Sequence, residues 1–326
     1  IDFEDGFGHR PETEEKEHAV RAARELATAL RQGIAPRRVG IRPRPISHDG
    51  RFQRTLGTFL RELATVGRVP EGFAVTVPKP LSADDVETAA YALMRLEDEL
   101  SLEAGRLHLE LMLETPEALM DDEGRCPLPR WVAAGMGRVR AVHLGPYDLT
   151  ASLGVIGSDQ DVDHPACDQA RATAAIALSR KGIWLADGPT TRLPIGPHRG
   201  DELTEAQEAE NRAVVHDAWA RHARNVRSAL RQGYVQGWDL HPGQLPARFG
   251  ALAAVFVAEL PAMAARLRRY VEAAAQATRT GADFDDAATA RGLVRWFRRG
   301  LDSGLLTPED LGRAGLGGTD LVPSGG

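Results

Sequence analysis

Cysteine is scarce in this sequence of 326 residues. Its two cysteines, Cys126 and Cys167, lie far apart and fit neither a disulfide framework nor a zinc-ligand pattern. A basic excess is also missing, because 40 Lys and Arg stand against 46 Asp and Glu, which argues against a nucleic-acid partner. The longest apolar run, Ala251–Leu260, is interrupted by Glu259 and is too short to cross a bilayer, and no signal-like segment opens the chain. We therefore expect a soluble, cytoplasmic protein with no membrane partner.

The chain has the composition of a folded protein, with 43% hydrophobic and 26% charged residues. Strand-like and helix-like runs alternate along it, which is typical of right-handed βαβ units and a parallel sheet. A closed (β/α)8 TIM barrel needs eight strands, and seven are found. Because the chain also opens on a strand-like run without Met, we expect the first strand upstream of Ile1. The seven candidate strands are Ile1–Glu4, Val39–Arg42, Phe73–Val77, Leu107–Leu113, Val139–Leu144, Ile183–Ala186 and Tyr234–Leu240.

The pattern changes after the last candidate strand. Residues 246–310 are helical in character and rich in Ala, Leu and Arg, with an interruption at Thr280–Asp286. We predict a catalytic TIM-barrel domain at 1–245, a helical C-terminal extension at 246–310 and a flexible, glycine-rich tail at 311–326. We expect the extension to form a lid across the mouth of its own barrel or of a neighbouring subunit.

The segment Leu107–Glu114 has a clear period of two. Leucine occupies every odd position, so the leucines should pack against helices while the polar even positions face the barrel interior. Glu114 ends this strand, at the edge where barrel enzymes hold their catalytic groups, and we interpret it as functional. We interpret Glu110, deeper in the strand, as an ion-paired interior residue.

Asp148 follows the next strand in the same way, within GPYDLTASLG. Asp148 and Glu114 could together hold a divalent cation, since magnesium takes one or two protein carboxylates and fills its shell with water and substrate oxygens. The alternative for Asp148 is a helix-capping role.

Three further groups lie at predicted strand ends. Arg42 could clamp a substrate carboxylate, whereas Arg44 fits a solvated surface arginine better. The acids Asp2, Glu4 and Asp5 would repel one another unless cations or waters share them. His241 could be catalytic or structural.

Six motifs, in order, resemble those of the HpcH/HpaI aldolase and citrate lyase β-subunit family, within the phosphoenolpyruvate/pyruvate barrel superfamily. The resemblance covers roughly Ile1 to Leu245 and suggests a divergent branch of that family. The motifs are IDFEDGFG, VGIR, VTVPKP, LMLETPEAL, GPYDLTASLG and GWDLHPGQLP.

The resemblance implies that Glu114 and Asp148 ligate Mg²⁺ or Mn²⁺. It implies that Arg42 contacts the substrate carboxylate or enolate oxygen, and that Glu4 and Asp5 hold metal-bound waters. Two departures matter. Asp5 stands where the aldolases have a histidine base, and the lyases' C-terminal aspartate-glycine-lysine motif has no clear counterpart near residues 281–286.

The resemblance thus implies a divalent-metal-dependent carbon–carbon lyase or aldolase. Such an enzyme would act through the enolate of a 2-oxo acid or an acyl-CoA, with a CoA thioester among the candidate substrates, and would form a homo-oligomer. Two alternatives remain open. One is a phosphoryl-transfer or thioester-hydrolysing enzyme acting on a phosphoenolpyruvate-like or acyl-CoA substrate, and the other is a non-catalytic metabolite-binding barrel.

Overall fold

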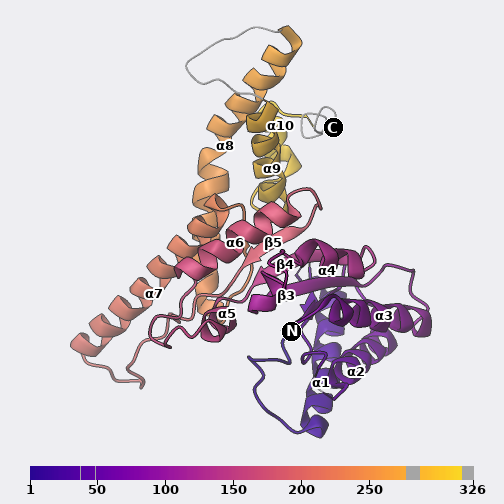
Figure 1. Cartoon of the computed structure of the whole chain (residues 1–326). Helices are drawn as coiled ribbons and strands as arrows, with labels where there is room; N and C mark the ends of the chain where they lie inside the picture. Colours follow the sequence, from indigo (N-terminus) through magenta and orange to yellow (C-terminus); the bar gives the residue numbers. More distant parts are fainter. Residues whose placement is uncertain (37, 48, 277–286, 318–326) are drawn as a thin grey trace. The chain divides into compact units, whose positions relative to one another are not determined.

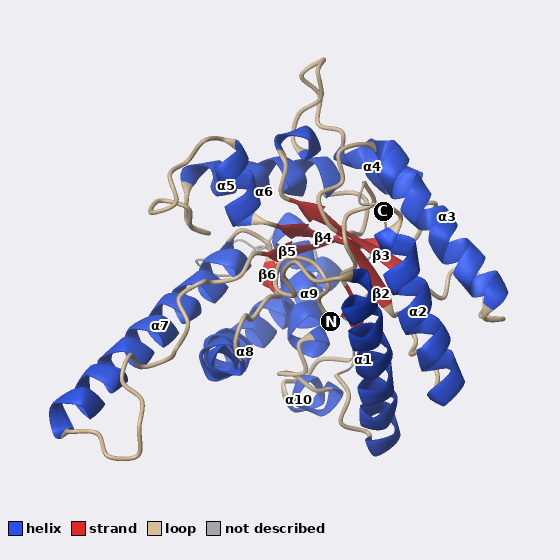
Figure 2. Cartoon of the chain, turned by 90° about the horizontal axis from the view of Figure 1, so that it is seen from below, coloured by secondary structure: helices blue, strands red, loops and turns tan. Residues whose placement is uncertain are grey.

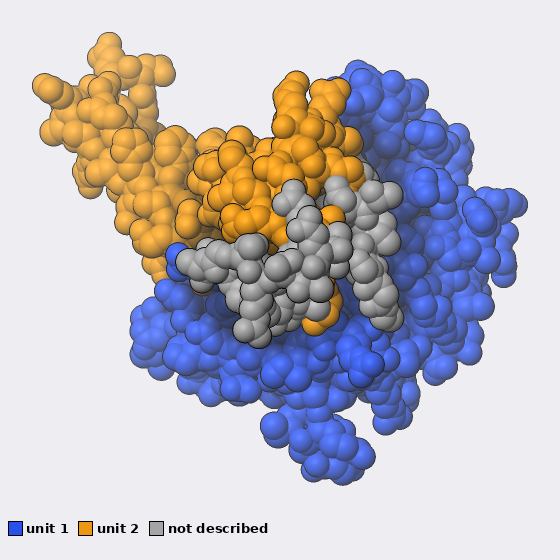
Figure 3. All heavy atoms as spheres, turned by 90° about the horizontal axis from the view of Figure 1, so that it is seen from above, with its two compact units in different colours: residues 1–190, 229–238 blue, residues 191–228, 239–326 orange. Residues whose placement is uncertain are grey.

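The computed structural model describes residues 1–36, 38–47, 49–276 and 287–317. The chain divides into two compact units, which Figure 3 colours separately. Unit 1 comprises Ile1–Thr190 and Ala229–Trp238, and unit 2 comprises Thr191–Ser228 and Asp239–Gly326. The boundary predicted at residue 245 thus lies inside unit 2, because the segment 191–228 groups with the C-terminal helices.

Unit 1 is built on a parallel six-stranded sheet in the order β1-β2-β3-β4-β5-β6 (Figure 2). Each strand pairs with the next one along the chain, as in successive βαβ units. The strands are β1 (Gly40–Ile41), β2 (Ala74–Val77), β3 (His108–Leu113), β4 (Val139–Leu144), β5 (Trp184–Asp187) and β6 (Val235–Gln236).

The start of the chain extends this sheet by one parallel bridge, between Asp2 and Arg42. The amide of Phe3 donates to the carbonyl of Arg42, and the amide of Arg42 donates to the carbonyl of Ile1, both at 2.8 Å. All seven predicted strand positions therefore take part in parallel pairing, the first only through this bridge. Among the described residues β6 does not pair with the chain start, so the structure shows a parallel α/β sheet, while the closed barrel and the upstream strand stay predictions.

Helices alternate with the strands of unit 1 (Figure 1). Helix α3 shows how local sequence sets a boundary. The side chain of Ser82 accepts from the amide of Asp85, whose carboxylate in turn accepts from the amide of Ser82, a capping box that satisfies two otherwise unpaired donors. The helices are α1 (Glu12–Gln32), α2 (Arg51–Val66), α3 (Ala83–Glu99), α4 (Leu128–Ala134), α5 (Pro146–Ser152) and α6 (Pro165–Leu178), with a 3₁₀ turn at Pro116–Ala118.

The hydrophobic core of unit 1 lies between the sheet and these helices. Leu107, Leu109, Leu111 and Leu113 are fully buried in it together with apolar side chains of α1, α2 and α3. The period of two in this strand is therefore confirmed. It leaves the even positions, which include Glu114, for the other face of the sheet.

Unit 2 is helical, as predicted for the C-terminal region. Trp296 packs on Phe256 with ring centroids 5.3 Å apart, and Phe256 and Phe297 are buried. The helices are α7 (Glu205–Arg231), of which residues 229–231 belong to unit 1, α8 (Leu245–Gln276), α9 (Ala287–Asp302) and α10 (Pro308–Arg313), with a 3₁₀ turn at Pro242–Gln244.

Residues 311–313 of the predicted tail form the end of α10, and residues 318–326 lie outside the described residues. The segment 281–286, considered for the lyases' C-terminal acid, also lies outside them. The lid role of the extension stays a prediction.

One helical stretch in the described part of the chain, Pro242–Val271, is long and apolar enough to cross a membrane by length and composition. The prediction that the longest apolar run is too short was therefore wrong, because apolar composition continues on both sides of Glu259. Length and composition fit the core helix of a soluble protein equally well, so this is weak evidence for a membrane span.

Candidate active site

Glu114 and Asp148 lie where neighbouring parallel strands end. Glu114 directly follows β3 and is 2% exposed, and Asp148 lies in the first turn of α5, just after β4. Burial, reinforced by the negative charge of Asp148, raises the pKa of Glu114 to about 8. Burial also raises the pKa of Asp148. The alternative of a capping Asp148 is wrong, since Gly145 occupies the N-cap position of α5 and no side chain bonds there.

The absence of a side chain at Gly145 leaves the space that the Glu114 side chain occupies. A Cβ atom on Gly145 would lie 2.5 Å from both Cβ and Oε2 of Glu114, closer than any ordinary contact. The amide of Gly145 also donates to the carbonyl of Leu113, at 2.9 Å, which fixes this backbone against the end of β3. The glycine at the start of the GPYDLTASLG motif is therefore needed for the close approach of α5 to the Glu114 carboxylate.

Lys79 connects the acidic residues of the site. Its amide donates to Oε1 of Glu114 at 2.7 Å, and its Nζ lies 2.5 Å from Oε1 of Glu4. Nζ also lies 3.1 Å from both carboxylate oxygens of Asp5 and 3.5 Å from Oδ1 of Asp148. Four carboxylates from three separate segments thus converge on one lysine.

The charge and backbone of Lys79 are both unusual. Burial alone would lower the pKa of the lysine, but the bond to Glu4 and the surrounding carboxylates outweigh it and raise the pKa. The ammonium therefore stays charged at neutral pH. The backbone has φ of +46°, a region that residues other than glycine rarely adopt and that is common at functional sites.

Arg42 lies at the same end of the sheet, and acidic side chains near the start of the chain hold it in place. Its Nε and Nη2 donate to the two carboxylate oxygens of Asp2, at 2.7 and 2.8 Å, and its Nη1 lies 3.1 Å from Oε2 of Glu4. Its guanidinium lies over the ring of Trp238, 4.9 Å from the ring centre. Only 9% of Arg42 is exposed, so these contacts largely fix where it can meet a substrate.

Two basic side chains reduce the repulsion among the three acids at the chain start, Asp2, Glu4 and Asp5. Arg42 pairs with Asp2 and Glu4, and Lys79 pairs with Glu4 and Asp5. The prediction that cations share these acids is therefore confirmed, and the cations are the side chains of Arg42 and Lys79. The roles of Glu4 and Asp5 toward a metal stay predictions.

Three other sequence candidates make contacts of their own. Arg44 is 6% exposed and contacts the buried Glu15 at 3.4 Å, so its interpretation as a solvated arginine is wrong, because a buried guanidinium needs a partner. His241 belongs to unit 2, where its Nδ1 accepts from the amide of Gly243 and caps a 3₁₀ turn, a structural role. Glu110 contacts Nε2 of His143 at 3.2 Å.

The charges of the site suit a divalent cation. Five carboxylates, those of Asp2, Glu4, Asp5, Glu114 and Asp148, face the two cations Arg42 and Lys79, a formal excess of three negative charges. Within the described residues no group of three or more His, Cys, Asp or Glu is arranged to hold a metal ion. Magnesium needs only one or two protein carboxylates, with water and substrate completing its shell, so Glu114 and Asp148 fit it.

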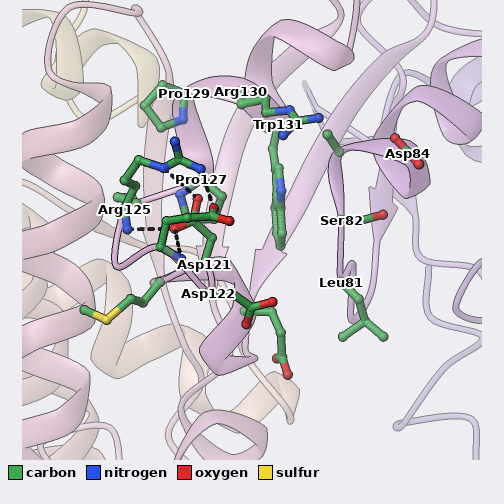
Figure 4. Close-up of a pocket in the computed structure, with 15 residues that line it drawn as sticks. Leu81, Ser82, Asp84, Asp121, Asp122, Arg125, Pro127, Pro129, Arg130 and Trp131 are labelled. Atoms are coloured by element: carbon green, nitrogen blue, oxygen red, sulfur yellow. Dashed lines mark hydrogen bonds and ion pairs between the residues drawn. The ribbon is translucent and has the colours of Figure 1, made fainter.

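A separate hollow of about 600 Å³ lies beside these strand ends (Figure 4). It is lined by the start of α3, the segment after β3 and the start of α4, and Trp131 forms one of its walls. Arg125 bonds to Asp121 at its edge. The residues predicted for the active site are not among its lining residues, so the hollow is not the site built around Lys79.

Sequence reasoning missed the roles of Asp2, Lys79 and Trp238. For Lys79 a signal was available, because it is one of only three lysines in a chain whose basic residues are otherwise arginines. It also stands between Pro78 and Pro80 directly after a strand, in the VTVPKP motif.

Solved structures share the fold of this chain. A citrate lyase from Burkholderia xenovorans LB400 is 22% identical, with a TM-score of 0.67 over 96% of this chain and 86% of that one. The Haloferax volcanii malate synthase in its lead(II) complex is 17% identical, with a TM-score of 0.52 over 91% and 80% of the two chains. The same enzyme in a pyruvate/acetyl-CoA ternary complex is 16% identical, with a TM-score of 0.50 over 93% and 85%.

No curated protein sequence matches the chain. A family model does match, over residues 1–322, which is nearly the whole length. The chain therefore belongs to the family described as a domain of unknown function, DUF6986.

Proposed function

We propose that this protein is a divalent-metal-dependent carbon–carbon lyase or aldolase that acts through the enolate of a 2-oxo acid or an acyl-CoA. The observation that carries the proposal is the buried carboxylate of Glu114. Its pKa is raised to about 8 by burial and by Asp148, so the amide and the ammonium of Lys79 do not fully compensate its negative charge. A divalent cation held by Glu114 and Asp148 would complete that compensation.

Mg²⁺ or Mn²⁺ bound there would polarise a substrate carbonyl and stabilise the negative charge of an enolate. The chain supplies the remaining charges. Arg42, fixed by Asp2 and Glu4, would add a positive charge beside the enolate oxygen or the substrate carboxylate. Lys79 keeps Glu4 and Asp5 at the rim of the site, where they would hold water next to the metal.

The likeness to other structures supports the substrate class. One of the similar structures is named a citrate lyase, and the malate synthase structure is a ternary complex with pyruvate and acetyl-CoA. We infer from this that the substrate is a small carboxylate or an acyl-CoA. We further propose that the protein is soluble and works in the cytoplasm, as its composition suggests, and that it forms a homo-oligomer, as the family resemblance implies.

A metal-supplemented substrate screen tests the proposal. Purified protein with MgCl₂ or MnCl₂ is mixed with 2-oxo acids, with 2-oxo acids plus aldehydes, and with β-hydroxyacyl-CoAs, and pyruvate and acetyl-CoA are measured. We expect release of one of them that stops with EDTA and in the Glu114→Gln variant. Release of free CoA or phosphate without carbon–carbon cleavage would instead support the hydrolytic or phosphoryl-transfer alternative, and ligand binding without turnover would support the binding barrel.

A further inference from the structure

Trp238 contacts Arg42 of the site through the face of its ring, and it contacts His143 of β4 through its indole nitrogen. Its ring faces the Arg42 guanidinium at 4.9 Å from ring centre to Cζ, a cation–π distance. Its indole Nε1 donates to Nδ1 of His143 at 2.9 Å, and the two rings meet edge to face, at 90° with centroids 5.7 Å apart. The indole is therefore fixed both by its N–H and by its ring plane.

His143 is held in turn by the neighbouring strand. Because its Nδ1 accepts the indole N–H, the imidazole carries its proton on Nε2. Nε2 lies 3.2 Å from Oε2 of Glu110 on β3, and the same oxygen accepts from Oγ1 of Thr76 on β2, at 3.2 Å. Side chains of β2, β3 and β4 thus form one line of polar contacts that ends at the tryptophan, in which the contact between His143 and Glu110 has the distance of an ion pair but not the geometry of a hydrogen bond.

The three contacts of Arg42 constrain it in different directions. Asp2 and Glu4 lie at the N–H groups of the guanidinium, and the ring face of Trp238 lies against its Cζ. Carboxylates alone leave the plane of a guanidinium free to tilt, because N–H···O bonds tolerate some change of angle. A ring packed against the guanidinium limits that tilt.

We propose that Trp238 is a positioning residue for Arg42, held in place by His143 and Glu110, and that it sets the plane in which Arg42 meets the anionic group of the substrate. The role of Arg42 toward substrate rests on the proposed function above. The link between Trp238 and Arg42 rests on geometry alone, so the two can be tested separately.

The first test measures the NMR signal of the Arg42 side chain in the absence of substrate. In the full-length protein labelled with ¹⁵N, the Nε–H signal of Arg42 is assigned by its loss in Arg42→Lys. We expect Trp238→Leu to shift this signal, because the ring current is lost, and to speed its exchange with water. Trp238→Phe keeps a ring and should preserve slow exchange in part.

Trp184→Leu is a matched control. Trp184 carries a cation–π contact of the same 4.9 Å length, with Arg38, but it starts β5, at the opposite end of the strands. This variant should leave the Arg42 signal unchanged. An Arg42 Nε–H signal that keeps its position and exchange rate in Trp238→Leu, with the fold intact by circular dichroism, would overturn the proposal. If Trp238→Leu does not fold, an unchanged exchange rate in Trp238→Phe together with an unchanged chemical shift has the same consequence.

The second test reads the consequence for the site. Oxalate, a stable mimic of a pyruvate enolate, is titrated into the protein with excess MgCl₂ in a calorimeter. We expect Trp238→Leu to weaken oxalate binding about tenfold, within the range of a desolvated cation–π contact, and Trp238→Phe to weaken it less. In an Arg42→Lys background the same substitution should have little further effect, since the residue it positions has already changed.

The results separate the two ideas. Wild type that does not bind oxalate would contradict the proposed function, while the Arg42 signal would still decide the positioning role. Equal oxalate affinity in wild type and Trp238→Leu would contradict the positioning role while leaving the proposed function in place.

Discussion

The amide of Lys79 donates a 2.7 Å hydrogen bond to Oε1 of Glu114, so the lysine that holds the other carboxylates with its side chain holds this one with its backbone. A single residue at the end of β2 therefore organises acids from the chain start, from β3 and from α5. The bond to Glu114 survives any substitution that keeps the backbone in place, whereas the contacts to Glu4, Asp5 and Asp148 depend on the ammonium. This separation makes the contribution of the side chain measurable.

Replacing Lys79 with Gln should make the protein more dependent on divalent cations. The variant removes the ammonium and leaves the carboxylates of Glu4, Asp5 and Asp148 without their shared cation, so we expect unfolding in EDTA at a lower temperature than for wild type. Added MgCl₂ should then raise the melting temperature more in the variant, because the ion replaces the lost charge. The exposed Lys181 provides the control, as Lys181→Gln should behave like wild type. Equal magnesium-induced shifts in Lys79→Gln and wild type would contradict this account of Lys79.

Replacing Gly145 with Ala should damage the site by steric contact alone. Gly145 has φ of −103°, which alanine adopts without strain, but the added methyl group would lie 2.5 Å from the Glu114 side chain. We expect the carboxylate to move and Mg²⁺ affinity to fall about tenfold, roughly 1.4 kcal/mol, as measured by calorimetry. Gly157→Ala, at a position with no atom within 4 Å, should bind the metal as wild type does. Unchanged affinity in Gly145→Ala would show that Glu114 does not need this space.

A buried ion pair far from the site should govern acid stability. Arg138 donates to both carboxylate oxygens of Glu97 at 2.7 Å, and both residues are buried. Burial alone would raise the pKa of Glu97, but the bonds from Arg138 and from two amides outweigh it and lower the pKa below its ordinary 4.5. A lowered carboxyl pKa stabilises the fold above pH 4.5, and this stability is lost as the pH falls through the folded-state value.

We therefore expect Arg138→Met to lower the free energy of unfolding at pH 7 by about 3 kcal/mol, because it leaves a buried charge unpaired. Below pH 4.5 the difference from wild type should shrink, because the unfolded chain takes up a proton on Glu97 that the paired carboxylate of folded wild type does not. Urea denaturation at pH 7 and pH 3.5 measures both values. The double variant Glu97→Met/Arg138→Met should be closer to wild type than the single one, and a single variant as stable as wild type at pH 7 would rule out a structural role for the pair.

The pKa of Glu114 predicts a second pH effect, of opposite sign. A carboxyl group whose pKa is raised from 4.5 to about 8 in the folded state contributes stability that is fully present below pH 4.5 and is lost as the pH rises to about 8. In EDTA, Glu114→Gln should therefore melt at least about 2 °C above wild type at pH 8.5, since that is the shift of ~1 kcal/mol in a chain of this size. The difference should narrow at pH 5.5. A variant that melts below wild type at pH 8.5 would mean that the buried charge is already compensated.

Much of the fold follows from short-range pattern. Alternation of leucine with polar residues in Leu107–Glu114 fixes both the strand and the side on which Glu114 lies, because side chains of a strand alternate between faces. The same reasoning put Asp148 at the end of the next strand. Both residues lie at the predicted strand ends, and Lys79 contacts both of them.

Other parts of the site depend on partners that are distant in the sequence. Arg42 was expected to face the substrate, but its pairing with Asp2 arises from a parallel bridge between segments 40 residues apart. The residues next to Arg44 in the sequence are like those around a surface arginine. Its partner Glu15 is brought to it only by the packing of α1. The segment 191–228 groups with the C-terminal helices, which no local pattern in this polar stretch indicates. Pairing of buried charges is a tertiary property, so sequence periodicity cannot supply it.

Calorimetry with Glu114→Gln tests whether Glu114 is a metal ligand. Glutamine keeps the size of the side chain and removes its charge, so the fold should survive while the cation loses one of its two carboxylates. If Glu114 is a ligand, Mg²⁺ and Mn²⁺ should bind wild type at pH 7.5 and bind Glu114→Gln about tenfold more weakly, a loss of roughly 1.4 kcal/mol. Equal affinity of the two proteins for either metal would contradict it.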